Sequence, residues 1–270
     1  MRYDANIKHN RFVLNLRYSA KQICRGYHCF FACLIAFASS PINTAFADCD
    51  KANFSIAIDV GHTPQKPGAI SARGVTEYGF NQRLATIIQK HLESHGFSKI
   101  HVLLTEGATQ DLLRRLQNTN AIKPDLFLSV HHDSAQPQFF AEWEYQGQLY
   151  PYSDIFKGWS LFISNHNSQP KNSFKFASLL ANALLKHGLP FSTHHAMAIK
   201  GEGRRFVDMD KGIYQFDNLI VLKGVHAPAV LLEAGVIVNR DEETQLSSIN
   251  RQSAISESVS KAVDEYCSSM

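Results

Sequence analysis

The chain has 270 residues, of which 44% are hydrophobic and 19% are charged, and its formal net charge is +3. Residues 1–47 hold six of the 27 basic residues and one of the 24 acidic ones, so the rest of the chain has a net charge near −2. Because no polybasic stretch remains there, nucleic acid is excluded as an expected partner. The roughly 220 residues after position 47 are enough for one α/β core.

Residues 1–47 have the features of an export signal. A basic region precedes the apolar run 29–38, and Ala45, Phe46 and Ala47 form the small-x-small pattern of a cleavage site. We therefore predict a signal peptide over residues 1–47, cleaved after Ala47, and one domain over residues 48–270. The apolar run is too short to span a bilayer as a mature helix. We expect an exported protein, periplasmic or extracellular, with an uncleaved membrane anchor as the alternative.

Two cysteines, Cys49 and Cys267, remain at opposite ends of the predicted mature chain. In an oxidising compartment, such an even pair indicates a disulfide that joins the two ends. The termini of single domains are often close together, which makes this bridge reasonable. The alternative is two unpaired thiols on frayed ends.

The spacing of apolar residues predicts alternating strands and helices. In chain order, we expect a strand over residues 54–60, a helix over 80–95, a strand over 100–104, a helix over 109–121, a strand over 126–130, a strand over 159–164, a helix over 173–187, strands over 219–222 and 229–233, and a helix over 253–266. Two stretches, 135–158 and 188–218, show no clear period, and we expect them to lie over one edge of the sheet. Strands separated by helices favour a single α/β domain with a mostly parallel, twisted sheet and helices on both faces.

Two histidines and two glutamates follow or end the predicted strands. His62 comes just after the first strand, and Glu77 lies just before the first helix. His131 ends the third strand, and Glu233 ends the last. In open parallel sheets, ligands bind outside the carboxyl ends of the strands, so these four side chains can meet in one crevice. Two histidines and one glutamate around an open position are a ligand set for catalytic zinc, and a second carboxylate nearby can act as general base.

Taken alone, each of these residues has a simpler interpretation. His62 could be a turn histidine, and Glu77 could be there for the helix dipole. Glu233 could pair with a lysine or arginine. At the end of an apolar strand, however, its carboxylate is expected to be partly desolvated, with a pKa raised towards the range useful for proton transfer. His132 competes with His131, but alternation along a strand puts the two rings on opposite faces, so only one can face the site.

Five motifs occur in a fixed order along almost the whole mature chain. They are IDVGH at 58–62, GVTEYGFN at 74–81, LT at 104–105, DLFLSVHHDS at 125–134 and PAVLLEAGVIVN at 228–239. In order, spacing and residue type, they resemble the zinc-dependent N-acetylmuramoyl-L-alanine amidases, which are bacterial cell-wall hydrolases. The resemblance covers about residues 54–262.

The resemblance implies an active site and a reaction. It implies that His62, Glu77 and His131 hold one zinc ion, that Glu233 is the catalytic glutamate, and that Asn81 sits beside Glu77. The implied reaction is zinc-dependent hydrolysis of the amide bond between N-acetylmuramic acid and L-alanine, with peptidoglycan or muropeptides as substrate. We expect a monomer.

Two further expectations concern partners. Some relatives carry a regulatory segment after the strand with the third ligand, which a partner protein displaces. Residues 135–158 stand at that place, so an activator protein is a further expectation, although their composition is not that of a long amphipathic helix. Stem peptides carry carboxylates, which makes four basic residues candidate substrate contacts, with ordinary surface charge as the alternative: Arg73, Lys200, Arg204 and Arg205.

Other functions use the same kind of site. A zinc carboxypeptidase or another metallopeptidase acting on the stem peptide would need the same four residues. An exported wall-binding protein with a catalytically silent site is the alternative from another class. A periplasmic solute-binding protein would need two lobes, which the length and pattern do not support.

Overall fold

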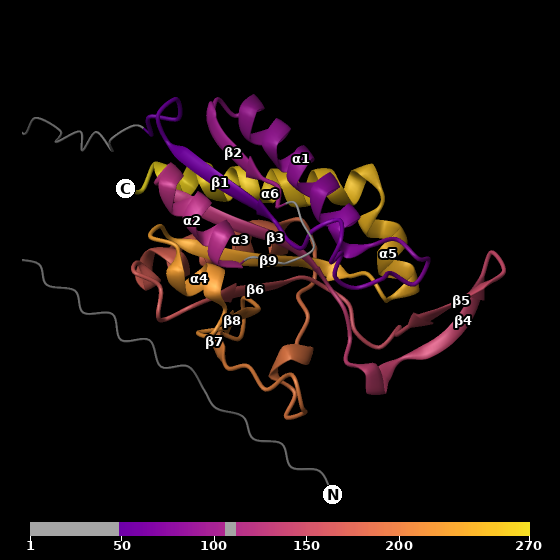
Figure 1. Cartoon of the computed structure of the whole chain (residues 1–270). Coiled ribbons are helices and arrows are strands. Elements are labelled where there is room, and N and C mark those ends of the chain that lie inside the picture. The colour runs from indigo at the N-terminus through magenta and orange to yellow at the C-terminus, as the bar shows by residue number, and fades with distance from the viewer. Residues whose placement is uncertain (1–48, 106–111) are drawn as a thin grey trace, which may run out of the picture. The chain divides into compact units, whose positions relative to one another are not determined.

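A computed structural model describes residues 49–105 and 112–270 of the chain. Its helices and strands, labelled in Figure 1, are β1 Ser55–Val60, α1 Glu77–Ser94, β2 Lys99–Leu103, α2 Leu112–Ile122, β3 Leu126–Asp133, β4 Ala141–Tyr145, β5 Gln148–Tyr152, β6 Ser160–Ile163, α3 Pro170–Lys186, β7 Phe206–Asp208, β8 Ile213–Gln215, α4 Ile220–Gly224, β9 Ala229–Val236, α5 Arg240–Leu246 and α6 Ile249–Cys267. Short 3-10 helices lie at Pro137–Phe139 and His194–Ala196.

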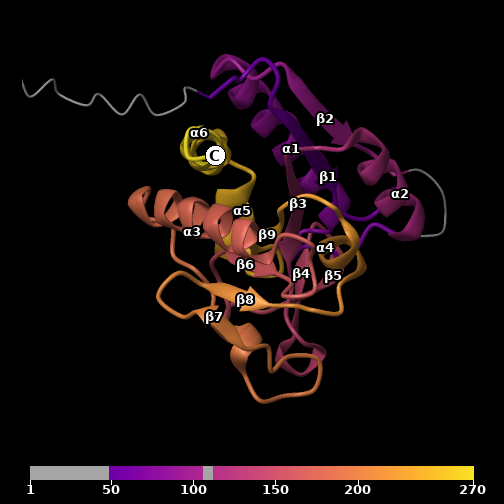
Figure 2. The same cartoon turned by 90° about the vertical axis from the view of Figure 1, so that its left-hand side faces the viewer.

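Within the described residues, seven strands form one mixed sheet in the order β2-β1-β3-β9-β6-β8-β7. The strands β2, β1, β3 and β9 are parallel, whereas β6 runs antiparallel to β9 and β7 antiparallel to β8. Helices α1, α3 and α6 cover one face, and α2 and α4 cover the other (Figure 2). The predicted α/β fold with a mostly parallel sheet and helices on both faces is therefore confirmed.

The first helix shows how the sequence determines an element that carries a site residue. The side chain of Thr76 caps α1 by accepting a hydrogen bond from the backbone N–H of Gly79. The apolar face of α1, with Phe80, Leu84 and Ile88, packs into the core. This cap starts the helix three residues earlier than the apolar pattern predicted, so that Glu77 stands in the first turn rather than in the loop.

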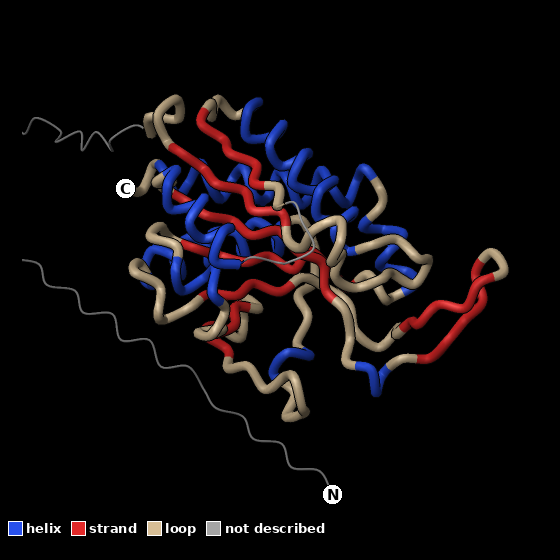
Figure 3. The backbone as a smooth tube through the Cα atoms, in the orientation of Figure 1, coloured by secondary structure: helices blue, strands red, loops and turns tan. Residues whose placement is uncertain are grey.

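Some predicted elements differ from the structure. Residues 219–222 are predicted as a strand, but Leu219 is the N-cap of the short helix α4 and the other three residues lie within it. A run of four apolar residues fits a buried helix as well as a strand. The first irregular stretch contains the hairpin β4–β5, a separate two-stranded sheet that extends away from the large sheet (Figure 3). The second irregular stretch, residues 188–218, contributes β7 and β8 to the sheet edge opposite β2. The predicted start of the second helix, at residue 109, lies outside the described residues.

Cys49 and Cys267 form a disulfide with Cα atoms 5.3 Å apart, as predicted. The bridge joins the first described residue to the last residue of α6, and so fastens the beginning of the domain to its closing helix. Among the described residues, no helix is long and apolar enough to cross a membrane. The predicted signal peptide and its cleavage site lie outside the described residues.

Candidate active site

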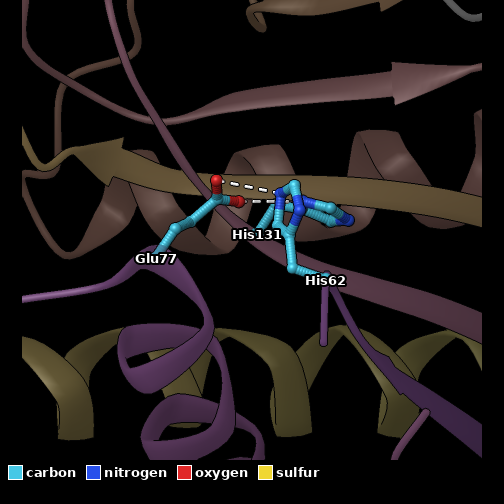
Figure 4. Close-up of side chains that lie close together, drawn as sticks. All are labelled: His62, Glu77 and His131. Atoms are coloured by element: carbon cyan, nitrogen blue, oxygen red, sulfur yellow. Dashed lines mark hydrogen bonds and ion pairs between the residues drawn. The ribbon is translucent and has the colours of Figure 1, made fainter. Parts of the chain in front are cut away.

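The structure brings His62, Glu77 and His131 together at the carboxyl ends of β1 and β3 (Figure 4). The Nε2 atom of His62 lies 2.9 Å from Oε2 of Glu77, and Nδ1 of His131 lies 3.0 Å from Oε1 of the same carboxylate. Burial raises the pKa of Glu77, but the hydrogen bonds with His131 and His62 outweigh it and hold that pKa well below its ordinary value. We call these three residues the first cluster.

Two glycines give the first cluster the room it needs. A Cβ atom at Gly61 would lie 2.4 Å from the ring of His131, and one at Gly68 would lie 2.3 Å from Oε2 of Glu77. His62 itself has a φ of 70°, which is uncommon for a residue other than glycine. Such strain persists where the surrounding structure enforces it, and it is concentrated at functional sites.

Asn81 supports the first cluster from α1, the helix that carries Glu77. Its amide nitrogen donates to the backbone oxygen of Gly61 at 3.2 Å and lies 3.4 Å from Oε1 of Glu77. Its oxygen accepts a hydrogen bond at 2.8 Å from Nδ1 of His132, which is buried on the α1 face of the sheet. Burial lowers the pKa of His132 to about 3, so this ring is neutral. The two rings are thus separated, with His131 in the first cluster and His132 against Asn81.

A buried ion pair holds the end of β1 from the opposite face. Asp59 accepts hydrogen bonds from Nε of Arg115, at 2.9 Å, and from the hydroxyl of Ser129, at 2.7 Å. Arg115 also donates to the backbone oxygen of Val60 at 3.0 Å. The strand end that leads into His62 is therefore fixed by side chains of α2 and β3. The sequence pattern had not indicated Arg115, because it lies on a helix far from the strand motifs.

Glu233 lies on β9 beside the first cluster. In the sheet register it is paired with His131 of β3 on one side and with Ser160 of β6 on the other. Its Oε2 atom is buried, and among the described residues it has no hydrogen-bond partner and forms no salt bridge with a lysine or arginine. Burial raises the pKa of Glu233 well above its ordinary value, and the carboxylates of Asp133 and Glu77 raise it further. The predicted desolvation is confirmed, and such a carboxyl group is suited to accept and return a proton.

Comparison with known proteins places this chain in a family. The family model for N-acetylmuramoyl-L-alanine amidase matches residues 56–265. The chain belongs to this family. It is therefore a peptidoglycan amidase, and the resemblance stated from the motifs is confirmed.

Known relatives and solved structures match this amidase at low sequence identity. AmiC of Escherichia coli is 22% identical over 78% of this chain and 52% of its own, so the chain spans about half of its length. The crystal structure of Ami1 from Mycobacterium smegmatis matches with a TM-score of 0.61 and 17% identity, over 81% of this chain and 99% of that chain. CwlD from Clostridioides difficile matches with a TM-score of 0.57 and 17% identity, over 79% of this chain and 98% of that chain. Its structure was solved in complex with the GerS lipoprotein.

The amidase has a second cluster of metal-ligand side chains, formed by Asp133, His194 and His195. Asp133 ends β3, two residues after His131, and the histidines lie on a 3-10 helix in the second irregular stretch. Burial lowers the pKa of His195, but the carboxylates of Asp133 and Glu202 outweigh it and raise that pKa to about 9. We call these three residues the second cluster. The sequence motifs do not indicate the second cluster, and the adjacent pair of histidines in an irregular stretch is the one signal that could have done so.

The four basic residues predicted as candidate substrate contacts divide into two groups. Arg73 pairs with Glu243, its Nη1 lying 2.6 Å from Oε2, which favours the alternative of a structural charge. Arg204 also pairs with a glutamate, its Nη1 lying 2.8 Å from Oε2 of Glu202, but together with Arg205 it lines a cavity of about 390 Å³. Lys200 is exposed in the same irregular stretch. For these last three residues, substrate contact stays a prediction.

Proposed function

We propose that this amidase hydrolyses the amide bond between N-acetylmuramic acid and L-alanine, with one zinc ion held by His62, Glu77 and His131 and with Glu233 as the catalytic residue. The observation that carries the proposal is the meeting of these four side chains at one edge of the sheet, in a chain whose family is established.

The donor atoms of the first cluster fit zinc. Zinc takes imidazole nitrogen and carboxylate oxygen at about 2.0–2.2 Å, and catalytic sites keep three protein ligands and one open position. Ligand atoms around a tetrahedral ion of that size are roughly 3.3 Å apart. The observed separations of 2.9 and 3.0 Å between the histidine nitrogens and the Glu77 oxygens need little adjustment to reach that value. Asn81 and the backbone N–H of Ala69 would keep the Glu77 carboxylate in place.

The chain's own residues then perform the proton transfers. Zinc in this position would polarise the substrate carbonyl and lower the pKa of bound water. Glu233, as a carboxylate, takes a proton from the attacking water and delivers it to the leaving amine of L-alanine. Its raised pKa suits both steps, because the same group must be a base before the attack and an acid afterwards.

The setting of the reaction follows from its substrate. Peptidoglycan lies outside the cytoplasmic membrane, so we propose export directed by residues 1–47 with cleavage after Ala47. The disulfide between Cys49 and Cys267 is consistent with an oxidising compartment. The solved complex of CwlD with a lipoprotein supports a protein partner for this fold, and an activator of this amidase stays a proposal.

Product analysis tests the proposal. The full chain, expressed so that it is exported and oxidised, is loaded with zinc and incubated with peptidoglycan, and the soluble products are identified by mass spectrometry. We expect intact stem peptides that begin at L-alanine, and we expect their release to stop when a chelator removes the metal and to return with zinc. Trimmed peptides still attached to muramic acid would contradict the amidase proposal and show that the enzyme is a peptidase. Release that is indifferent to the chelator would contradict zinc dependence.

A further inference from the structure

We propose that the second cluster is a further metal site, in which Asp133, His194 and His195 bind a divalent transition-metal ion of the zinc type. Two imidazoles and one carboxylate are donors that such ions prefer. The proposal concerns residues outside the first cluster, and it stands or falls independently of the hydrolysis proposed above.

The three donor atoms converge on a small volume. Oδ2 of Asp133 lies 2.7 Å from Nε2 of His195 and 3.3 Å from Nε2 of His194. The two imidazole rings lie against each other, with centroids 4.0 Å apart. Ligand atoms around a tetrahedral zinc ion are roughly 3.3 Å apart, so a small outward movement of Asp133 would make room for the ion.

The state of His194 argues for a cation between these atoms. The side chain is 3% exposed, and among the described residues its Nε2 atom has no hydrogen-bond partner although Asp133 is near. Its Nδ1 lies 2.6 Å from the hydroxyl of Ser192. We assign the ring proton to Nδ1, donating to Ser192, because Nε2 makes no hydrogen bond. Nε2 then has a lone pair on the side of the Asp133 carboxylate, an arrangement that a shared cation stabilises.

Both histidines have the outer contacts that metal-ligating histidines normally make. Such a histidine donates its other ring N–H to a carboxylate, carbonyl or hydroxyl group, which fixes the tautomer and the orientation of the ring. Ser192 accepts this hydrogen bond from His194, and Glu202 accepts it from His195. Oε2 of Glu202 lies 2.9 Å from Nδ1 of His195. Glu202 is held in turn by Gln136, whose amide donates to its other oxygen at 2.7 Å.

The competing interpretation is a metal-free network of ion pairs. A protonated His195 between the carboxylates of Asp133 and Glu202 would account for both of its hydrogen bonds. It leaves His194 with a buried Nε2 that makes no hydrogen bond among the described residues, although Oδ2 of Asp133 lies only 3.3 Å away. A metal ion accounts for both rings at once, and we therefore favour the metal site.

Zinc stoichiometry tests the proposal. Full-length chains without an affinity tag, expressed so that they are exported and oxidised, are stripped of metal, dialysed against zinc and analysed by mass spectrometry for metal content. We expect two equivalents in the unaltered protein and one in the variant His62→Ala/His131→Ala, in which the second cluster is intact. We also expect one equivalent in His194→Ala/His195→Ala and none in the variant with all four changes.

The controls separate a built site from adventitious binding. Exchanging two exposed histidines, in His187→Ala/His226→Ala, should leave both equivalents bound. Ser192→Ala and Glu202→Gln keep all three ligands, and each should weaken the second equivalent by roughly 10–100-fold. A folded His62→Ala/His131→Ala variant that binds no zinc would overturn the proposal and leave the ion-pair network. If that variant does not fold, equal zinc content in the unaltered protein and in His194→Ala/His195→Ala would overturn the proposal.

Discussion

The first and second clusters contain the same kinds of side chain, but different parts of the chain position them. In the first, the ligands follow β1, open α1 and lie near the end of β3, and the buried pair of Asp59 and Arg115 holds the end of β1 in place. In the second, only Asp133 comes from a strand of the sheet, and both histidines come from a 3-10 helix in residues 188–218. Regular elements therefore bring the first cluster together, whereas an irregular segment has to fold back onto the sheet to complete the second.

The largest effect should come from the residue that lies beside the first cluster. In Glu233→Gln, we expect turnover to fall by roughly 10²–10⁴-fold, because the amide cannot accept the proton of water. Zinc should remain bound, since Glu233 is not one of the proposed ligands. The measurement is the rate of stem-peptide release from peptidoglycan. Glu202→Gln, at the second cluster, is the matched control and should lose much less. Near-normal turnover of Glu233→Gln would remove Glu233 from the mechanism.

The support under the first cluster can be broken directly. Arg115→Met removes one partner of a buried ion pair, and we expect the free energy of unfolding to fall by about 3–5 kcal/mol. Urea denaturation followed by circular dichroism measures the change. Lys261→Met breaks an exposed pair with Glu265 and should cost no more than about 1 kcal/mol. Equal costs for the two variants would mean that the buried pair has no special part in holding β1.

The disulfide provides a test that is remote from both clusters. In Cys49→Ala/Cys267→Ala, we expect the free energy of unfolding to fall by about 2–5 kcal/mol, because the bridge restricts the unfolded chain. Adding a reductant to the unaltered protein should reproduce that loss during urea denaturation. Turnover per folded molecule should stay the same. A drop in turnover of the folded variant would show that the closing helix influences the site.

The outer contacts of the two clusters can be compared by zinc affinity. Asn81→Ala removes one of the hydrogen-bond partners of Glu77, and we expect the first cluster to bind zinc roughly 10–100-fold more weakly. The same change should leave the second equivalent untouched, whereas Ser192→Ala should do the reverse. Competition with a chelator of known affinity measures both. If either substitution weakened both equivalents alike, the clusters would be one coupled site.

The smallest effect concerns pH and the metal-free protein. The pKa of Glu233 is higher in the folded than in the unfolded state, so its contribution to stability is present below the unfolded pKa of about 4.3 and is lost as pH rises towards the folded pKa. The unaltered protein therefore loses stability as pH rises, whereas Glu233→Gln has no such group to ionise. The unfolding free energy of Glu233→Gln minus that of the unaltered protein should increase from pH 4 to pH 8. A difference that is constant over that range would contradict the raised pKa.

The sheet and the first cluster could be predicted because both depend on local patterns with a simple spatial consequence. A strand followed by a helix places the end of the strand at a common edge, so His62, His131 and Glu233 had to lie near one another once the sheet was parallel. The starting point of α1 depended on Thr76, a capping contact that the apolar spacing does not reveal. That contact moved Glu77 from the loop into the helix without moving it away from the site.

The rest could not be predicted, because it depends on contacts between segments that have no periodic pattern. His194 and His195 reach Asp133 through the path of residues 188–218, which the sequence marks only as irregular. The apolar run at 219–222 suited a strand or a helix equally, and packing against α2 decided for the helix. Arg115 has no sequence relation to Asp59 and becomes its partner only when α2 lies over β1.

Anomalous diffraction at the zinc edge, from crystals of the zinc-loaded protein, tests the account most directly. We expect one peak within about 2.0–2.2 Å of His62, Glu77 and His131, with Glu233 beside it and not coordinating. We expect a second, separate peak between Asp133, His194 and His195. A map without a peak at the first cluster would contradict the proposed catalytic site, and a map with that peak alone would contradict the second site.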